Sequence, residues 1–155
     1  MSTTHEKSSH CIDVCNRLLR GELSAVETYS QAIDKHGSSA ADGELRRIRS
    51  EHSLAANLLS ANVRDMGGDP DSDSGAWGLF ATAVQSAANL FGPDSAIDSL
   101  RRGEEAGRDD YQEALLDPDV TADCKRLIRE ELLPRVIRHI STLEGLERTL
   151  QVTPR

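Results

Sequence analysis

The chain has 155 residues, of which 37% are hydrophobic, 28% charged and 3% aromatic, and its formal net charge at pH 7 is -8. This length suits one globular domain with its own core, so we expect residues 1–155 to form a single domain. The scarcity of aromatic residues argues against a β-sandwich or barrel, and the negative charge argues against a nucleic-acid partner, which binds through lysines and arginines.

Apolar residues recur every three or four positions along four segments, which predicts amphipathic helices rather than strands. We expect these helices at about residues 8–36, 42–66, 93–116 and 121–150. Clusters of Gly, Pro, Asn, Asp and Ser separate them. Gly67 and Gly68 are expected to end the second helix, and Pro134 predicts a kink about one turn before His139 in the fourth helix.

The lengths of the connections predict the topology. Short turns should make the first two helices one antiparallel hairpin and the last two helices another. Residues 67–92 form a long crossover, within which Trp77–Phe91 has the pattern of a short helix. The sequence therefore predicts an all-α, ferritin-like four-helix bundle with one long crossover that contains a short helix.

Each apolar stripe is interrupted near its middle by one ionisable residue. These residues are Glu22, His52, Glu104 and His139, one in each helix. An isolated buried charge is costly unless it is paired, protonated or bound to a metal. Two carboxylates and two imidazoles offer oxygen and nitrogen ligands for iron, manganese or zinc. The alternative is a bundle without metal, a scaffold or stress-related protein whose polar core groups satisfy one another.

The heights of the four residues can be compared, because residues equidistant from the turn of an antiparallel hairpin lie side by side. The midpoint between Glu22 and His52 is Gly37, which lies inside the expected turn. The midpoint between Glu104 and His139 falls just after Thr121, later than the expected turn. The second pair should therefore be offset by several residues, at about 1.5 Å each.

Two tyrosines and three cysteines accompany these stripes. Tyr29 and Tyr111 each follow an inward glutamate by seven residues, and we expect their hydroxyls to reach those same carboxylates. The cysteines, whose odd number argues against a disulfide framework, are interpreted as small core residues rather than ligands. They are Cys11, Cys15 and Cys124.

Several stretches resemble known families. The run LRGELSAVETYSQAI resembles the first helix of bacterioferritin and rubrerythrin-type proteins, in which an inward Glu precedes a Tyr by one heptad, as Glu22 precedes Tyr29 here. The stretches GGDPDSDSGAWG, LRRGEEAGRDDYQEAL and IREELLPRVIRHISTLEGL resemble a ferritin-like four-helix family of unknown function, over about residues 12–147.

The resemblance implies a metal centre with Glu22, His52, Glu104 and His139 as ligands. In the ferritin-like pattern the second and fourth helices each supply Glu-x-x-His, but Arg49 and Val136 stand where the two glutamates belong. A metal-dependent, ferroxidase-like oxidoreductase that handles iron or peroxide is one interpretation, and a protein without catalytic activity is the other. We expect Arg49, Tyr29 and Tyr111 to surround the ligands, with Arg49 pairing a carboxylate.

No apolar run in the sequence is long enough to cross a bilayer, and the first residues lack the apolar region of a signal peptide. We therefore expect a cytoplasmic protein without a membrane partner. The apolar residues of the crossover would either cover one side of the bundle or form a contact in a homodimer or higher homo-oligomer. They are Trp77, Leu79, Phe80, Leu90 and Phe91.

Overall fold

The computed structural model describes residues 2–36, 41–74 and 93–152, and every regular element in these ranges is helical. The elements are α1 (Ser2–His36), α2 (Asp42–Asp65), α4 (Pro93–Leu116), α5 (Ala122–Leu127), η2 (Ile128–Leu132) and α6 (Leu133–Val152). Because α5, η2 and α6 follow one another without a break, they form one rod. The described residues therefore build four helical rods, which confirms the all-α prediction.

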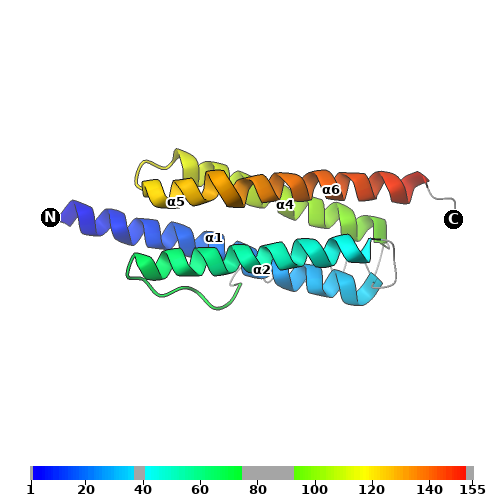
Figure 1. Cartoon of the computed structure of the whole chain (residues 1–155), viewed down its shortest axis with the longest axis horizontal. Helices are drawn as coiled ribbons and strands as arrows, with labels where there is room; N and C mark the ends of the chain where they lie inside the picture. Colours follow the sequence, from blue (N-terminus) through cyan, green and yellow to red (C-terminus); the bar gives the residue numbers. More distant parts are fainter. Residues whose placement is uncertain (1, 37–40, 75–92, 153–155) are drawn as a thin grey trace.

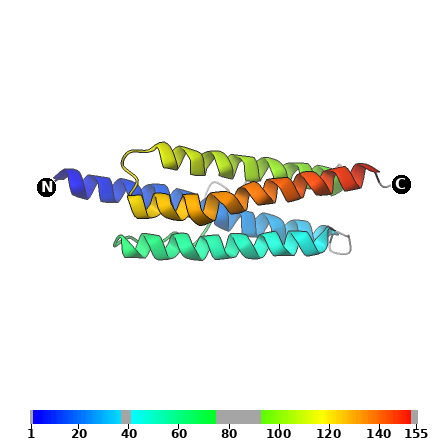
Figure 2. The ribbon, with the colours of Figure 1, turned by 45° about the horizontal axis from the view of Figure 1, so that its top comes forward.

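The rods pair as two antiparallel hairpins, α1 with α2 and α4 with the rod that contains α6 (Figure 1). Figure 2 shows the same four rods lying lengthwise beside one another. α2 ends and α4 begins at opposite ends of the bundle (Figure 1), which is the arrangement that a long crossover requires. The short helix expected within Trp77–Phe91, and the apolar surface expected there, lie outside the described residues.

The observed helix bounds agree with the predicted ones, except that α1 begins at Ser2. Gly67 ends α2 as expected, because its φ of 83° lies in the left-handed region that favours glycine. The backbone N–H of Gly68 donates to the carbonyl of Val63 at 2.9 Å, which closes the end of the helix. Among the described residues, no helix combines the length and apolar character needed to cross a membrane.

A π-helical segment, η2, lies just before the place where the sequence predicts a kink. Pro134 has no N–H to donate to the preceding turn, and it lies just after this segment, in the first turn of α6. A π-helical turn inserts an extra residue and rotates everything that follows about the helix axis. The rotated stretch carries Val136 and His139, both of which are buried.

Two clusters of buried apolar residues fill the bundle, one toward each end. One cluster contains, among others, Cys15, Leu19, Leu59, Tyr111 and Ile128. The other contains, among others, Tyr29, Ile33, Ile48, Leu100 and Leu143. In α1, α2 and α4 the sequence passes from one cluster to the other across a buried ionisable residue, so a polar layer lies between two apolar cores.

Candidate metal centre

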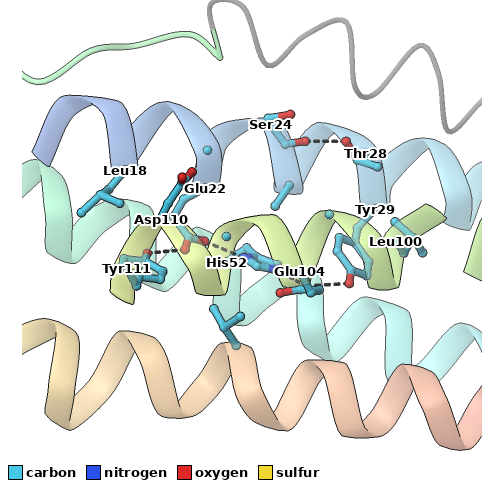
Figure 3. A pocket seen from close by; sticks show the side chains of 15 residues that line it. Leu18, Glu22, Ser24, Thr28, Tyr29, His52, Leu100, Glu104, Asp110 and Tyr111 are labelled. Atoms are coloured by element: carbon cyan, nitrogen blue, oxygen red, sulfur yellow. Dashed lines mark hydrogen bonds and ion pairs between the residues drawn. The ribbon is translucent and has the colours of Figure 1, made fainter. Parts of the chain in front are cut away.

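The four ionisable residues singled out from the sequence are all buried in this polar layer. Glu22, His52 and Glu104 are each 5% exposed, and His139 is 1% exposed. They come from α1, α2, α4 and α6, and Figure 3 shows the first three converging between the helices. The expected offset between Glu104 and His139 does not separate them, because Nδ1 of His139 lies 3.4 Å from Oε2 of Glu104.

His52 lies between two carboxylates. Its Nδ1 is 2.5 Å from Oε2 of Glu22, and its Nε2 is 2.6 Å from Oε1 of Glu104 (Figure 3). Burial alone would lower the pKa of His52, but the charges of Glu104 and Glu22 oppose this effect and raise that pKa well above its ordinary value. In this arrangement His52 is an imidazolium that bridges two carboxylates.

His139 is held differently. Its Nε2 lies 3.3 Å from Oε1 of Glu51, whose side chain is 23% exposed. Its Nδ1 faces Glu104, yet the pair lacks the geometry of a hydrogen bond, so this buried nitrogen has no hydrogen-bond partner among the described residues. A buried polar atom without a partner is rare in folded proteins and asks for an explanation, such as an ion that the atom binds.

Glu51 is not among the residues that the sequence singles out. Its contact with His139 joins α2 to α6, and the two residues are 88 positions apart. Hydrophobic periodicity indicates which face of a helix is buried, but it does not indicate which residues at the edge of that face meet a neighbouring helix. The sequence therefore carries no signal for this pair.

Three of the four residues can share one ion. One ligand atom from each of His52, Glu104 and His139 lies within 4.8 Å of the other two, and all three residues are buried. Two imidazole nitrogens and one carboxylate oxygen form a ligand set that suits iron, manganese or zinc. This cluster could hold a metal ion, whereas Glu22 contacts the far nitrogen of His52 instead.

The tyrosines reach carboxylates, but not the ones expected. Tyr29 donates a hydrogen bond to Oε1 of Glu104 at 2.7 Å, and Tyr111 donates one to Oε1 of Glu22 at 2.5 Å. Each tyrosine thus bonds the glutamate of the facing helix, because seven residues along its own helix span about 10.5 Å, too far for its hydroxyl. Burial, together with these carboxylates, raises the pKa of both tyrosines well above the ordinary value.

The two residues that replace the ferritin-like glutamates lie in different surroundings. Arg49 donates to Oγ of Ser30 at 3.3 Å, so the expected pairing of Arg49 with a carboxylate is replaced by a contact with α1. Val136 is buried and lines the cavity described below. An apolar side chain therefore stands where the ferritin-like pattern has a glutamate ligand.

A cavity of about 50 Å³ lies between α1 and α4, against Glu22, His52 and Glu104. Small residues leave this space open. They include Gly21 and Ala25 on α1, and Gly103 and Gly107 on α4. A Cβ atom added at Gly107 would meet nothing within 4 Å. Since a water molecule needs only about 10–15 Å³ by this measure, the cavity can hold a few waters or one small molecule beside the cluster.

The two histidines at the centre stabilise the ionised form of Glu104. Burial alone would raise the pKa of Glu104, but His52 and His139 oppose this effect and lower that pKa below its ordinary value. Glu104 is therefore ionised at neutral pH, and its Oε1 accepts from both His52 and Tyr29. A cation in this layer would meet an ionised carboxylate held in a fixed orientation.

A protein-family model matches most of the chain. No curated protein and no solved structure matches the chain. The matching family is described as Domain of unknown function (DUF2383), and it aligns with residues 10–117, a stretch that contains Glu22, His52 and Glu104 but ends before His139. This match carries no link to bacterioferritin or rubrerythrin, so that relationship stays a prediction. Because the match covers more than half of the chain, the chain belongs to the DUF2383 family.

Proposed function

We propose that this protein binds one metal ion in the core of its bundle, through His52, Glu104 and His139. The observation that carries the proposal is the buried Nδ1 of His139, which faces Glu104 and has no hydrogen-bond partner. Leaving a buried nitrogen unpaired costs about 1–3 kcal/mol, and a metal ion between these side chains would remove that cost.

The surroundings of the two histidines support the same proposal. Histidines that bind metals usually have a carboxylate or carbonyl on their other ring nitrogen, which fixes the tautomer and the orientation of the ring. Glu22 lies on the far nitrogen of His52, and Glu51 lies on the far nitrogen of His139. The near nitrogens are thereby directed toward Glu104 from two different helices.

The ligand set favours iron or manganese. Two histidines and one carboxylate leave coordination positions open, a pattern typical of non-haem iron sites. Iron or manganese would supply one-electron chemistry with a small oxidant such as peroxide. The protein's own residues would orient the ligands, exclude bulk water with the two apolar clusters, and admit a small molecule through the cavity between α1 and α4.

A relationship to ferritin-like proteins is part of this proposal. It is supported by the two antiparallel hairpins, by the opposite positions of the end of α2 and the start of α4, and by one inward Glu or His on each rod. Arg49 and Val136 stand where the ferritin-like pattern has glutamates, which favours one ion over the two of a ferroxidase centre.

One observation favours the second candidate, a metal-free bundle that serves as a scaffold. Both ring nitrogens of His52 already contact carboxylate oxygens, so a protonated His52 neutralises much of the charge without a metal. In that case Glu22, His52 and Glu104 form a network that fixes how the helices pack, as buried polar networks do in some proteins.

Metal content distinguishes the two candidates. The protein is purified without chelators, analysed for bound metals, and titrated without oxygen with Fe(II), Mn(II) or Zn(II). We expect about one ion per chain and a loss of binding in His139→Ala and His52→Ala. Glu105→Gln serves as the matched control, since Glu105 adjoins Glu104 but pairs with Arg101 outside the core. Equal binding by all of these proteins, or no binding, favours the scaffold.

A further inference from the structure

Three cysteines from two helical rods gather beside the N-terminal half of α1, whereas Tyr29 lies in its C-terminal half. Cys11 and Cys15 lie one turn apart on α1, and Cys124 lies in α5. All three are fully buried, and their sulfur atoms lie within 4.8 Å of one another. The sulfurs of Cys15 and Cys124 are 3.1 Å apart and are not bonded as a disulfide.

Polar groups are directed at these sulfurs, which is unusual for cysteines that only fill space. The side-chain amide of Asn62 donates to Sγ of Cys15 at 3.4 Å, and the backbone N–H of Thr121 donates to Sγ of Cys11 at 3.5 Å. N–H groups stabilise the thiolate form of a cysteine, which is the form that binds metals. Two of the three sulfurs thus already accept an N–H group that would also stabilise a metal-bound thiolate.

We propose that Cys11, Cys15 and Cys124 form a second metal site, which takes a soft, thiophilic ion, and that Cu(I) is the ion that fits. Thiolates select Cu(I) and Zn(II) among biological metals. Structural zinc almost always takes four ligands, whereas Cu(I) is stable with three sulfurs. Among the described residues, the group that could share an ion here consists of these three cysteines without a His, Asp or Glu.

The geometry requires only a small adjustment. Metal–sulfur bonds of about 2.3 Å hold three sulfurs about 4 Å apart around a central ion. The sulfurs of Cys15 and Cys124 would therefore move apart by about 1 Å, a movement that side-chain rotation can supply.

This site is separate from the proposed centre in the polar layer. Cys15 precedes Glu22 by seven residues, which corresponds to about 10 Å along α1. The two sites also differ in chemistry, since one offers sulfur and the other offers nitrogen and oxygen. Binding of Cu(I) at the cysteines can therefore be tested whether or not His52 and His139 bind a metal.

The test uses the full chain, reduced and free of oxygen, titrated with Cu(I) against a chromophoric Cu(I) chelator. We expect one tightly bound Cu(I) per chain and an ultraviolet thiolate-to-copper charge-transfer band. Each of Cys11→Ala, Cys15→Ala and Cys124→Ala should weaken binding by more than the roughly 10- to 100-fold that loss of an outer partner of a ligand costs. The matched control Glu105→Gln, which changes only an ion pair with Arg101 outside the core, should keep the Cu(I) affinity.

A measurement on the unaltered protein covers the case in which a cysteine variant does not fold. X-ray absorption of the copper-loaded protein should show three sulfur neighbours around the metal. A spectrum dominated by nitrogen or oxygen neighbours would overturn the proposal. Reduced protein that binds no Cu(I) would overturn it as well. This holds even if exposure of the protein to air then yields a disulfide between Cys15 and Cys124.

Discussion

Nδ1 of His139 lies 3.4 Å from Oε2 of Glu104, inside the bundle, without forming a hydrogen bond to it. His52, in contrast, contacts carboxylate oxygens with both ring nitrogens. In the metal-free protein His52 thus has partners on both ring nitrogens and His139 on one, although both are buried in the same polar layer.

Replacing each histidine by leucine should therefore have different effects on stability. His52→Leu leaves Glu22 and Glu104 buried without their cation, and we expect it to lower the free energy of unfolding by about 3–5 kcal/mol. His139→Leu removes an unsatisfied nitrogen, so the change should stay within about 1 kcal/mol. Urea unfolding of the metal-free variants measures both values, and equal losses would contradict this account of His139.

The tyrosines give a test that needs no mutation. The chain has two tyrosines, and both are buried with their hydroxyls bonded to carboxylates. Since the pKa of each lies well above its ordinary value of 10, the folded protein should show no tyrosinate absorbance as pH rises until it unfolds. The same chain in guanidinium should titrate near pH 10. An early rise in absorbance from the folded protein would show that a hydroxyl is accessible.

Removal of a single hydroxyl tests the same bonds energetically. Tyr29→Phe and Tyr111→Phe each leave a buried carboxylate with one donor fewer, and we expect each to cost about 1–3 kcal/mol of stability. Thermal unfolding followed by circular dichroism measures the loss. Variants as stable as the original protein would mean that water replaces the lost donor.

The stability of the metal-free protein should fall as pH rises above neutrality. The pKa of His52 is raised in the folded chain, so its contribution is fully present below the unfolded pKa of about 6.5 and is lost as pH rises toward the folded value. The pKa of Glu104 is lowered in the folded chain, so its contribution to stability is lost only in acid, as pH falls toward the folded value. Stability should decline by up to about 1.4 kcal/mol per pH unit over the alkaline part of this range.

Denaturant unfolding between pH 7 and pH 9 measures this slope. His52→Gln provides the control, because glutamine does not titrate and the variant should lose most of the dependence on pH. The same slope in both proteins would assign it to other groups.

Variants at two glycines test access to the site separately from helix stability. Gly107 lines the cavity, and Gly145 lies in α6 and is not among the residues that line it. Each Gly→Ala change should stabilise its helix by about 0.5–1 kcal/mol, since neither new methyl group would clash. Gly107→Ala alone should slow the reaction of a metal-loaded centre with peroxide, as stopped-flow absorbance would show. Equal rates in both variants would argue against entry through this cavity.

The sequence alone predicts which residues are buried, but not which ones touch. The apolar period gives four helices and places Glu22, His52, Glu104 and His139 on inward faces, and all four are buried. Contacts between helices also depend on the rotation and height of each rod, which a period does not determine. The pairing of Tyr29 with Glu104 is one contact that the sequence does not reveal.

Cys124 illustrates the same limit. The four-residue spacing of Cys11 and Cys15 shows that they share a face, but Cys124 joins them from another helix, more than a hundred residues later. The π-helical segment is a similar case, because Pro134 signals a disturbance in the fourth helix without showing its form.

The cavity between α1 and α4 limits what could reach the proposed metal centre. A volume of about 50 Å³ has room for dioxygen, peroxide or a few waters, and none for a sugar, a nucleotide or a peptide side chain. If a metal ion binds here as proposed, its chemistry would be restricted by size before it is restricted by charge. Larger reducing partners would have to deliver electrons from outside the bundle, without entering it.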